Sequence, residues 1–144
     1  MRCHTSKSCE AFTLIEMVIA LALSTIVISA SIHGYIMSSK RAEWAAYSLA
    51  AHSLAMQRIE QTRAAKWDPA GFPPVDDLTN RPPAVDILDI PISGTNIAYA
   101  TSITTIATVS LNPPLKKIRV ECVWPFVNRG LFTNVVVTYR APDQ

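Results

Sequence analysis

The residue types that most often carry chemistry are few in this sequence, and their spacing matches no familiar reactive site. There are three cysteines and three histidines among 144 residues. Cys3, His4 and Cys9 lie close together but lack the spacing and the fourth ligand of a zinc site. Cys122 alternates with apolar residues, so we expect a buried, inert thiol. The sequence has no glycine-rich phosphate loop, nucleophile elbow or paired-histidine motif, and we predict that the protein is not an enzyme and binds no metal or cofactor.

Aspartates gather in a proline-rich stretch, residues 68–94, and carboxylates are the ligands that calcium prefers. These aspartates are Asp68, Asp76, Asp77, Asp86 and Asp89. Their spacing matches no calcium-loop motif, and acidic residues among prolines are typical of a stiff, solvated connector. We therefore predict an irregular connector over residues 68–94, with calcium binding as the alternative.

Glu16 is distinctive because a long uncharged run begins directly after it. Residues 17–39, 23 positions, contain no Asp, Glu, Lys or Arg. A helix of that length spans about 35 Å, and a bilayer core is roughly 30 Å thick. We predict a transmembrane helix over 17–39; a cleaved signal peptide is the alternative, although its apolar core is usually only about 7–15 residues long. A carboxylate at the head of such a helix is commonly functional, unless it merely lies at the membrane interface.

Charge and composition narrow the function classes. The chain has 13 Lys and Arg against 11 Asp and Glu, a net charge of +2, which is too balanced to indicate nucleic acid as the partner. Hydrophobic residues make up 49% and charged residues 17%, which excludes a disordered chain. A second hypothesis is a binding module whose basic residues contact phosphate. Those residues are Lys116, Lys117, Arg119, Arg129 and Arg140.

The absence of proline between residues 12 and 68 predicts one long helix over 12–67, which ends before Asp68-Pro69. Its second half has two apolar faces. Ala42, Ala45, Leu49, Met56, Ile59 and Trp67 form one face, and Trp44, Tyr47, Ala51 and Leu54 form the other. We expect one face to pack on the rest of the chain and the other to face neighbouring helices.

Residues 95–144 have the period of two that is typical of strands. Apolar or β-branched residues alternate over 97–105, 118–124 and 131–139, with turns near 112–114 and 128–130. We predict a three-stranded antiparallel meander, with a short fourth strand near 86–92. Its apolar face should pack on the helix, which gives an α+β fold.

Residues 11–16, Ala-Phe-Thr-Leu-Ile-Glu, together with the apolar run, resemble the processing site of type IV prepilins and type II secretion pseudopilins. The resemblance implies a leader peptide over 1–11. It also implies that prepilin peptidase cuts between Ala11 and Phe12, that Phe12 becomes N-methylated, and that Glu16 pairs with an N-terminal amine during assembly. Two features depart from the family pattern: Ala11 replaces the usual glycine, and Glu10 places an acidic charge beside the cut.

The order of elements also resembles the type IV pilin-like plan of a long N-terminal helix, a connector and a small sheet. Residues 116–125 are similar to the end of minor pilins, of the I class in type II secretion or of the pilus-modification type. The resemblance implies a minor pseudopilin, a structural subunit of a type II secretion pseudopilus or a type IV pilus-like filament. A DNA-uptake or adhesive minor pilin is the alternative.

The same resemblance implies where the protein resides and what it meets. We expect a single pass through the bacterial inner membrane, with the C-terminal head in the periplasm. The expected partners are other pilins or pseudopilins, prepilin peptidase and an inner-membrane assembly platform.

Overall fold

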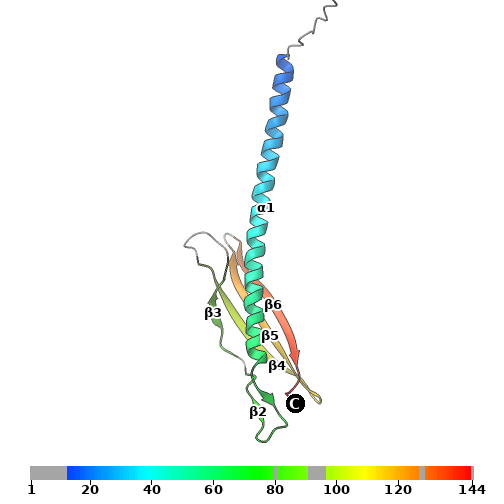
Figure 1. The fold of residues 1–144 in the computed structure, drawn as a ribbon, viewed down its shortest axis with the longest axis vertical. Coiled ribbons are helices and arrows are strands. Elements are labelled where there is room, and N and C mark those ends of the chain that lie inside the picture. Colours follow the sequence, from blue (N-terminus) through cyan, green and yellow to red (C-terminus); the bar gives the residue numbers. More distant parts are fainter. Residues whose placement is uncertain (1–12, 80, 91–96, 127–128, 144) are drawn as a thin grey trace, which may run out of the picture. The chain divides into compact units, whose positions relative to one another are not determined.

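The computed structural model describes residues 13–79, 81–90, 97–126 and 129–143. The chain divides into two compact units, one ending at Arg41 and one beginning at Ala42. The boundary falls inside the helix α1, Leu14–Arg63, which has 50 residues (Figure 1).

The first unit consists of the start of α1. The described residues from Thr13 to Arg41 are all exposed in the structure, and they include apolar side chains on every side of the helix. A helix that is apolar all round requires an apolar surrounding. α1 is long and apolar enough to cross a membrane by length and composition.

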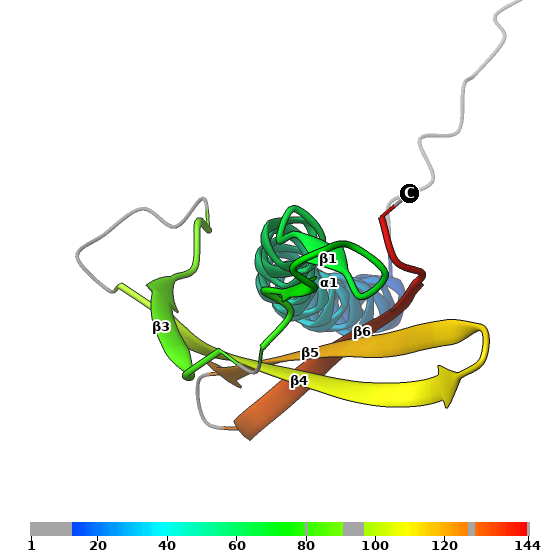
Figure 2. The same cartoon turned by 90° about the horizontal axis from the view of Figure 1, so that it is seen from below.

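The second unit contains the end of α1 and two antiparallel sheets. The larger sheet has the order β3-β4-β5-β6, and the smaller pairs β1 with β2. The strands are β1 (Trp67–Asp68), β2 (Val75–Asp76), β3 (Ala84–Ile87), β4 (Tyr99–Leu111), β5 (Pro114–Phe126) and β6 (Gly130–Arg140). Figure 2 shows the end of α1, the part that belongs to this unit, over one face of the larger sheet. The α+β arrangement of a long N-terminal helix and antiparallel strands is confirmed, and it is consistent with a type IV pilin-like fold.

The core lies between α1 and the central strand β5. Ile118, Val120, Cys122 and Trp124 are all fully buried, as their alternation predicts. The helix covers them with a stripe spaced by three or four residues: Tyr47, Ala51, Ala55, Ile59 and Thr62. Ala51 and Ala55 have no exposed surface, so the small side chains allow the helix backbone to approach the sheet closely.

Aromatic rings fill one end of this core. Trp124 stacks on Phe132 at 5.2 Å between ring centroids and on Tyr47 at 5.8 Å. Asn134 joins the same region to the helix, because its side chain accepts a hydrogen bond from Trp124 Nε1 and donates one to the Ser48 carbonyl. The helix and the sheet are thus joined by both apolar and polar contacts.

The predicted helix end was wrong. α1 ends at Arg63, and Trp67 instead begins β1. Trp67 N donates to the Asp143 carboxylate, and Trp67 O accepts from Asp143 N. These bonds hold the backbone of Trp67 to the C-terminal segment, which replaces the bonds that a continued helix would make.

The connector is also more ordered than predicted. Residues 68–94 contain β2 and β3, together with Asp68 of β1, and β3 at Ala84–Ile87 begins two residues before the expected fourth strand. Residues 91–96 lie outside the described part of the chain, as does Asn128 of the predicted second turn. Gly130, at the end of that turn, has a φ of 88°, a conformation that favours glycine.

The structure also shows which helix face packs inward. Tyr47, Ala51 and Leu54 of the second predicted face contribute to the core, whereas Leu49 and Met56 of the first face are exposed. Ile59, which we assigned to the first face, is buried. The inward stripe therefore lies between the two predicted faces.

Candidate functional site

Glu16 lies in the first turn of α1 and contacts Thr13. Its Oε2 accepts hydrogen bonds from Thr13 N at 3.0 Å and from Thr13 Oγ1 at 3.1 Å. Glu16 N donates in return to Thr13 Oγ1 at 3.3 Å. This reciprocal pair is a capping box, which satisfies backbone N–H groups that a helix start leaves without partners.

The predicted processing residues, Ala11 and Phe12, lie outside the described residues. Thr13 follows Phe12 directly, so the capping box begins at the second residue after the expected cut. Our sequence reasoning missed this role of Thr13. The signal was present, because a threonine followed three positions later by a glutamate, ahead of an apolar run, is the usual mark of a capping box.

Three hydroxyl groups in the apolar stretch form hydrogen bonds within the helix. Ser24, Thr25 and Ser31 donate to the carbonyls of Ala20, Leu21 and Val27, at 2.7 to 2.8 Å. A hydroxyl bonded to its own helix exposes little polar surface to lipid. These residues therefore do not prevent α1 from spanning a membrane.

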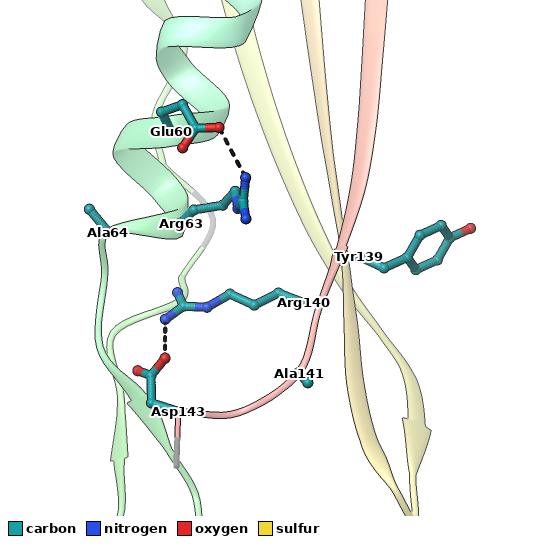
Figure 3. A pocket seen from close by; sticks show the side chains of 7 residues that line it. All are labelled: Glu60, Arg63, Ala64, Tyr139, Arg140, Ala141 and Asp143. Carbon is teal, nitrogen blue, oxygen red and sulfur yellow. Dashed lines mark hydrogen bonds and ion pairs between the residues drawn. The ribbon is translucent and has the colours of Figure 1, made fainter.

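A shallow pocket of about 490 Å³ lies in the second unit, between the end of α1 and the end of β6. Glu60, Arg63, Ala64, Tyr139, Arg140, Ala141 and Asp143 line it. Figure 3 shows that its charged groups bind one another, Arg63 to Glu60 and Arg140 to Asp143, while the Tyr139 ring points away. Two neutralised ion pairs provide neither a nucleophile with a base nor a free charge for a substrate.

Arg140 and Asp143 instead hold the chain end in place. Arg140 donates to the carbonyl of Ala65, and Asp143 accepts from Trp67 N. The pKa of Asp143 is lowered from its ordinary value of 3.8, chiefly by the hydrogen bond from Trp67 N and then by the one from Arg140. We call this group of contacts the C-terminal clasp.

Three of the five aspartates of the connector have partners within the chain. Asp68 accepts from Gly71 N, Asp76 binds Lys116, and Asp86 lies 3.6 Å from Arg58. Among the described residues, no three His, Cys, Asp or Glu side chains gather as a metal site would require. The structure therefore offers no support for the calcium alternative.

Several of the basic residues considered for phosphate binding are engaged within the head. Lys116 is buried, binds Asp76, and lies 5.0 Å from the centroid of the Trp67 ring. Arg119 binds Glu121, and Arg140 belongs to the C-terminal clasp. Cations that are already paired contribute less to binding a polyanion.

Cys122 is fully buried on β5. Burial raises the pKa of its thiol to about 11, with a smaller contribution from the charge of Asp86. Since the thiolate is the reactive form, this residue acts as a small apolar core residue, as its alternation predicts.

Comparison with known proteins finds one family match, near the start of the chain. Residues 6–32 match the family described as the prokaryotic N-terminal methylation motif, which is typical of type IV prepilin-like proteins. The match covers both predicted processing residues, Glu16 and the first part of the apolar run. No curated protein and no solved structure matches the chain.

Proposed function

We propose that this chain is a minor pseudopilin, a structural subunit of a type II secretion pseudopilus or a type IV pilus-like filament. The observation that carries the proposal is the methylation motif over residues 6–32, placed directly at the start of an apolar helix that can span a membrane. Such a motif implies processing by prepilin peptidase and assembly with other pilins. In this proposal the enzyme cuts between Ala11 and Phe12 and methylates the new amino group of Phe12.

The proposal gives each unit a mechanical role. The first unit anchors the chain in the inner membrane as a single pass until assembly, and afterwards contributes an apolar helix to the filament interior. The second unit forms the head, on the periplasmic side. An apolar filament interior favours burial of Glu16 only when the carboxylate has a charged partner, because an unpaired buried charge costs several kcal/mol.

Intact-mass measurement tests the processing step. The full chain is produced in bacterial membranes with and without a prepilin peptidase. With the enzyme, we expect loss of residues 1–11 and addition of one methyl group at Phe12. The control is Phe12→Asp, which puts a charged residue in place of the phenylalanine that follows the expected cut. This variant should remain full length. A wild-type chain that keeps its leader in the presence of the peptidase would contradict the proposal.

Two substitutions separate the two roles of Glu16. Glu16→Gln keeps a side chain that can close the capping box but removes the charge, whereas Glu16→Ala removes both. If Glu16 pairs with an amine, both variants should be processed normally but should enter filaments about tenfold less than wild type. If its role is only to cap the helix, Glu16→Gln should assemble as wild type does. Glu60→Gln, at an exposed position in the second unit, controls for loss of a carboxylate.

A further inference from the structure

The face of the larger sheet that α1 does not cover differs between its two ends. Cys122 and Trp124 of β5 are buried beneath α1, so Val123 and Pro125, which alternate with them, belong to the uncovered face. At one end, a row of exposed apolar side chains crosses all four strands, and the register of the sheet places them side by side. We call them the apolar row: Ile87 of β3, Tyr99 of β4, Pro125 of β5 and Leu131 of β6. Toward the other end, β5 carries charged residues on the same face: Lys117, Arg119 and Glu121.

The apolar row exposes large side chains. Leu131 is 72% exposed, Ile87 is 60% exposed and Tyr99 is 53% exposed. Val85, which is 65% exposed, continues the apolar surface along β3. Single exposed apolar residues are ordinary, but a contiguous group that joins four strands marks a contact with another molecule or with a membrane.

The apolar row lies at the end of the head where α1 enters it. Trp44, near the start of this unit, has its ring centroid 6.3 Å from that of Phe132, which follows Leu131 along β6. At the far end of the same strand, Arg140 donates to the carbonyl of Ala65, just beyond the end of α1. The apolar row is therefore beside the beginning of the head part of α1, and the charged residues of β5 are nearer its end.

The membrane-spanning stretch begins within two helical turns of this point. α1 is one continuous helix, and Trp44 follows the uncharged run over 17–39 by five residues, which is about 8 Å along the helix. Lys40 and Arg41 lie between them, are exposed, and can place their cations among lipid phosphates. Trp44 is 42% exposed, and tryptophan and tyrosine are enriched where a bilayer meets water. Lipid headgroups are therefore within reach of this end of the head.

We propose that the apolar row rests in the surface of the bilayer from which α1 emerges, with phospholipid as its partner. The charged residues of β5 on the same face then remain in water. Five charged residues lie near this contact, three positive and two negative, so apolar contact rather than charge supplies most of the attraction. These residues are Lys40, Arg41, Arg129, Glu43 and Asp89. The contact rests on the membrane-spanning helix of the proposed function, but on neither processing nor filament assembly.

Fluorescence quenching in vesicles tests the contact with the full chain. A chain with Cys3→Ser, Cys9→Ser and Leu131→Cys carries an environment-sensitive dye at position 131. It is reconstituted with a large excess of phosphatidylethanolamine and phosphatidylglycerol, part of which carries a nitroxide quencher near the headgroup. We expect blue-shifted emission, and quenching at least about threefold stronger than for the dye at Val137→Cys. Val137 is the matched control because it is an exposed apolar residue of the same strand and face, toward the charged end. The parent chain, which retains only the buried Cys122, measures background labelling.

Substitutions in the rest of the apolar row give a second readout. Ile87→Glu and Tyr99→Glu change exposed side chains, so the fold should tolerate them, but a carboxylate resists transfer into lipid. Together they should reduce quenching of the dye at Leu131→Cys to the level found at Val137→Cys. Thr105→Glu adds the same charge to an exposed position of the same face, opposite Arg119, and should leave the quenching unchanged.

Three results would overturn the proposal. Equal quenching at positions 131 and 137 would show that lipid does not prefer the apolar end. A blue shift at position 131 that nitroxide lipid does not quench, and that disappears on dilution with more lipid, would show that the row packs on a second copy. Quenching that persists in the Ile87→Glu, Tyr99→Glu chain would show that the dye, rather than the row, enters the lipid.

Carbonate extraction of the same vesicles separates this contact from the proposed function. A chain that carbonate removes from the membrane would contradict the membrane anchor on which the proposed function depends. An anchored chain whose dyes remain in water would contradict only the contact between the apolar row and lipid.

Discussion

Asn134 is a single side chain that joins three parts of the head. It lies on β6, accepts from Trp124 Nε1 on β5, and donates to Ser48 O on α1. In sequence it is one polar residue among alternating ones, and nothing local distinguishes it from the threonines nearby. Its role arises only when the fold brings the strand beneath the helix.

Asn134→Leu should destabilise the head by about 1–3 kcal/mol, because the buried indole N–H of Trp124 would lose its acceptor. Urea unfolding followed by circular dichroism measures the effect. Thr133→Ala, at the neighbouring exposed position, is the control and should change the free energy of unfolding by less than about 0.5 kcal/mol. Equal effects of the two substitutions would contradict this role of Asn134.

Asp143 should make the head sensitive to acid. Its pKa is lower in the folded chain than its ordinary value of 3.8, so its stabilising contribution is present above that value and is lost as the pH falls through the folded pKa. Asp143→Asn should therefore unfold at lower urea than wild type at about pH 7, and the difference should shrink at about pH 2.5. If the wild type and Asp143→Asn differ in stability by the same amount at both pH values, the charge of the Asp143 carboxylate does not stabilise the head.

Cys122 should resist alkylation in the folded head. Its folded pKa of about 11 exceeds the ordinary value of 9.0, so the stability that the protonated thiol contributes is present below pH 9.0 and is lost as the pH rises toward 11. In a chain with Cys3→Ser and Cys9→Ser, iodoacetamide at about pH 8 should react at least about a hundredfold faster after unfolding in urea. Rapid reaction of the folded chain would show that the core around β5 opens readily.

At the scale of elements, the sequence predicted the strands better than the ends of the helix. The alternation of Ile118, Val120, Cys122 and Trp124 is a local property, and it correctly identified the buried face of β5. The end of α1 depends on Arg140 and Asp143, which lie about 75 residues further along the chain. The two-residue strands β1 and β2 pair with each other, but they are too short to show an alternating pattern, and Asp143 and Lys116, which bind them, lie far along the chain.

The spacing between helix and sheet depends on two alanines. Ala55→Leu should cost about 1–3 kcal/mol, because the residue has no exposed surface and the larger side chain would separate α1 from β5. Ala45→Leu makes the same change on the exposed side of the helix and should have little effect on unfolding. Similar losses for both variants would place the packed face elsewhere on the helix.

At the scale of the whole molecule, the two units require different surroundings. The part of α1 before Ala42 has no buried residue in the described structure, whereas the rest of the chain has its own core. The sequence likewise identified one part of the candidate site and missed another. Glu16 and the motif around it were identified from residue order alone, and the spacing of Thr13 and Glu16 also held the signal of the capping box, but the C-terminal clasp became visible only from the folded chain.

The division predicts that residues 42–144 fold without the apolar helix. Produced alone, this fragment should be monomeric at low concentration and should unfold cooperatively in urea. Ile118→Asp in the same fragment places a charge in the fully buried core and should prevent folding, which provides the control. A wild-type fragment that aggregates or lacks a cooperative transition would show that the head needs the first part of α1.

The aromatic end of the core also provides an optical signal. Trp44 on α1 and Trp124 on β5 have ring centroids 6.3 Å apart, at an interplanar angle of 53°. Two indoles at this distance and angle are close enough for their electronic transitions to couple as an exciton pair. The resulting circular dichroism signal would show whether α1 is packed against β5. It needs no dye or label, so it can be measured while the protein is in a membrane or a filament.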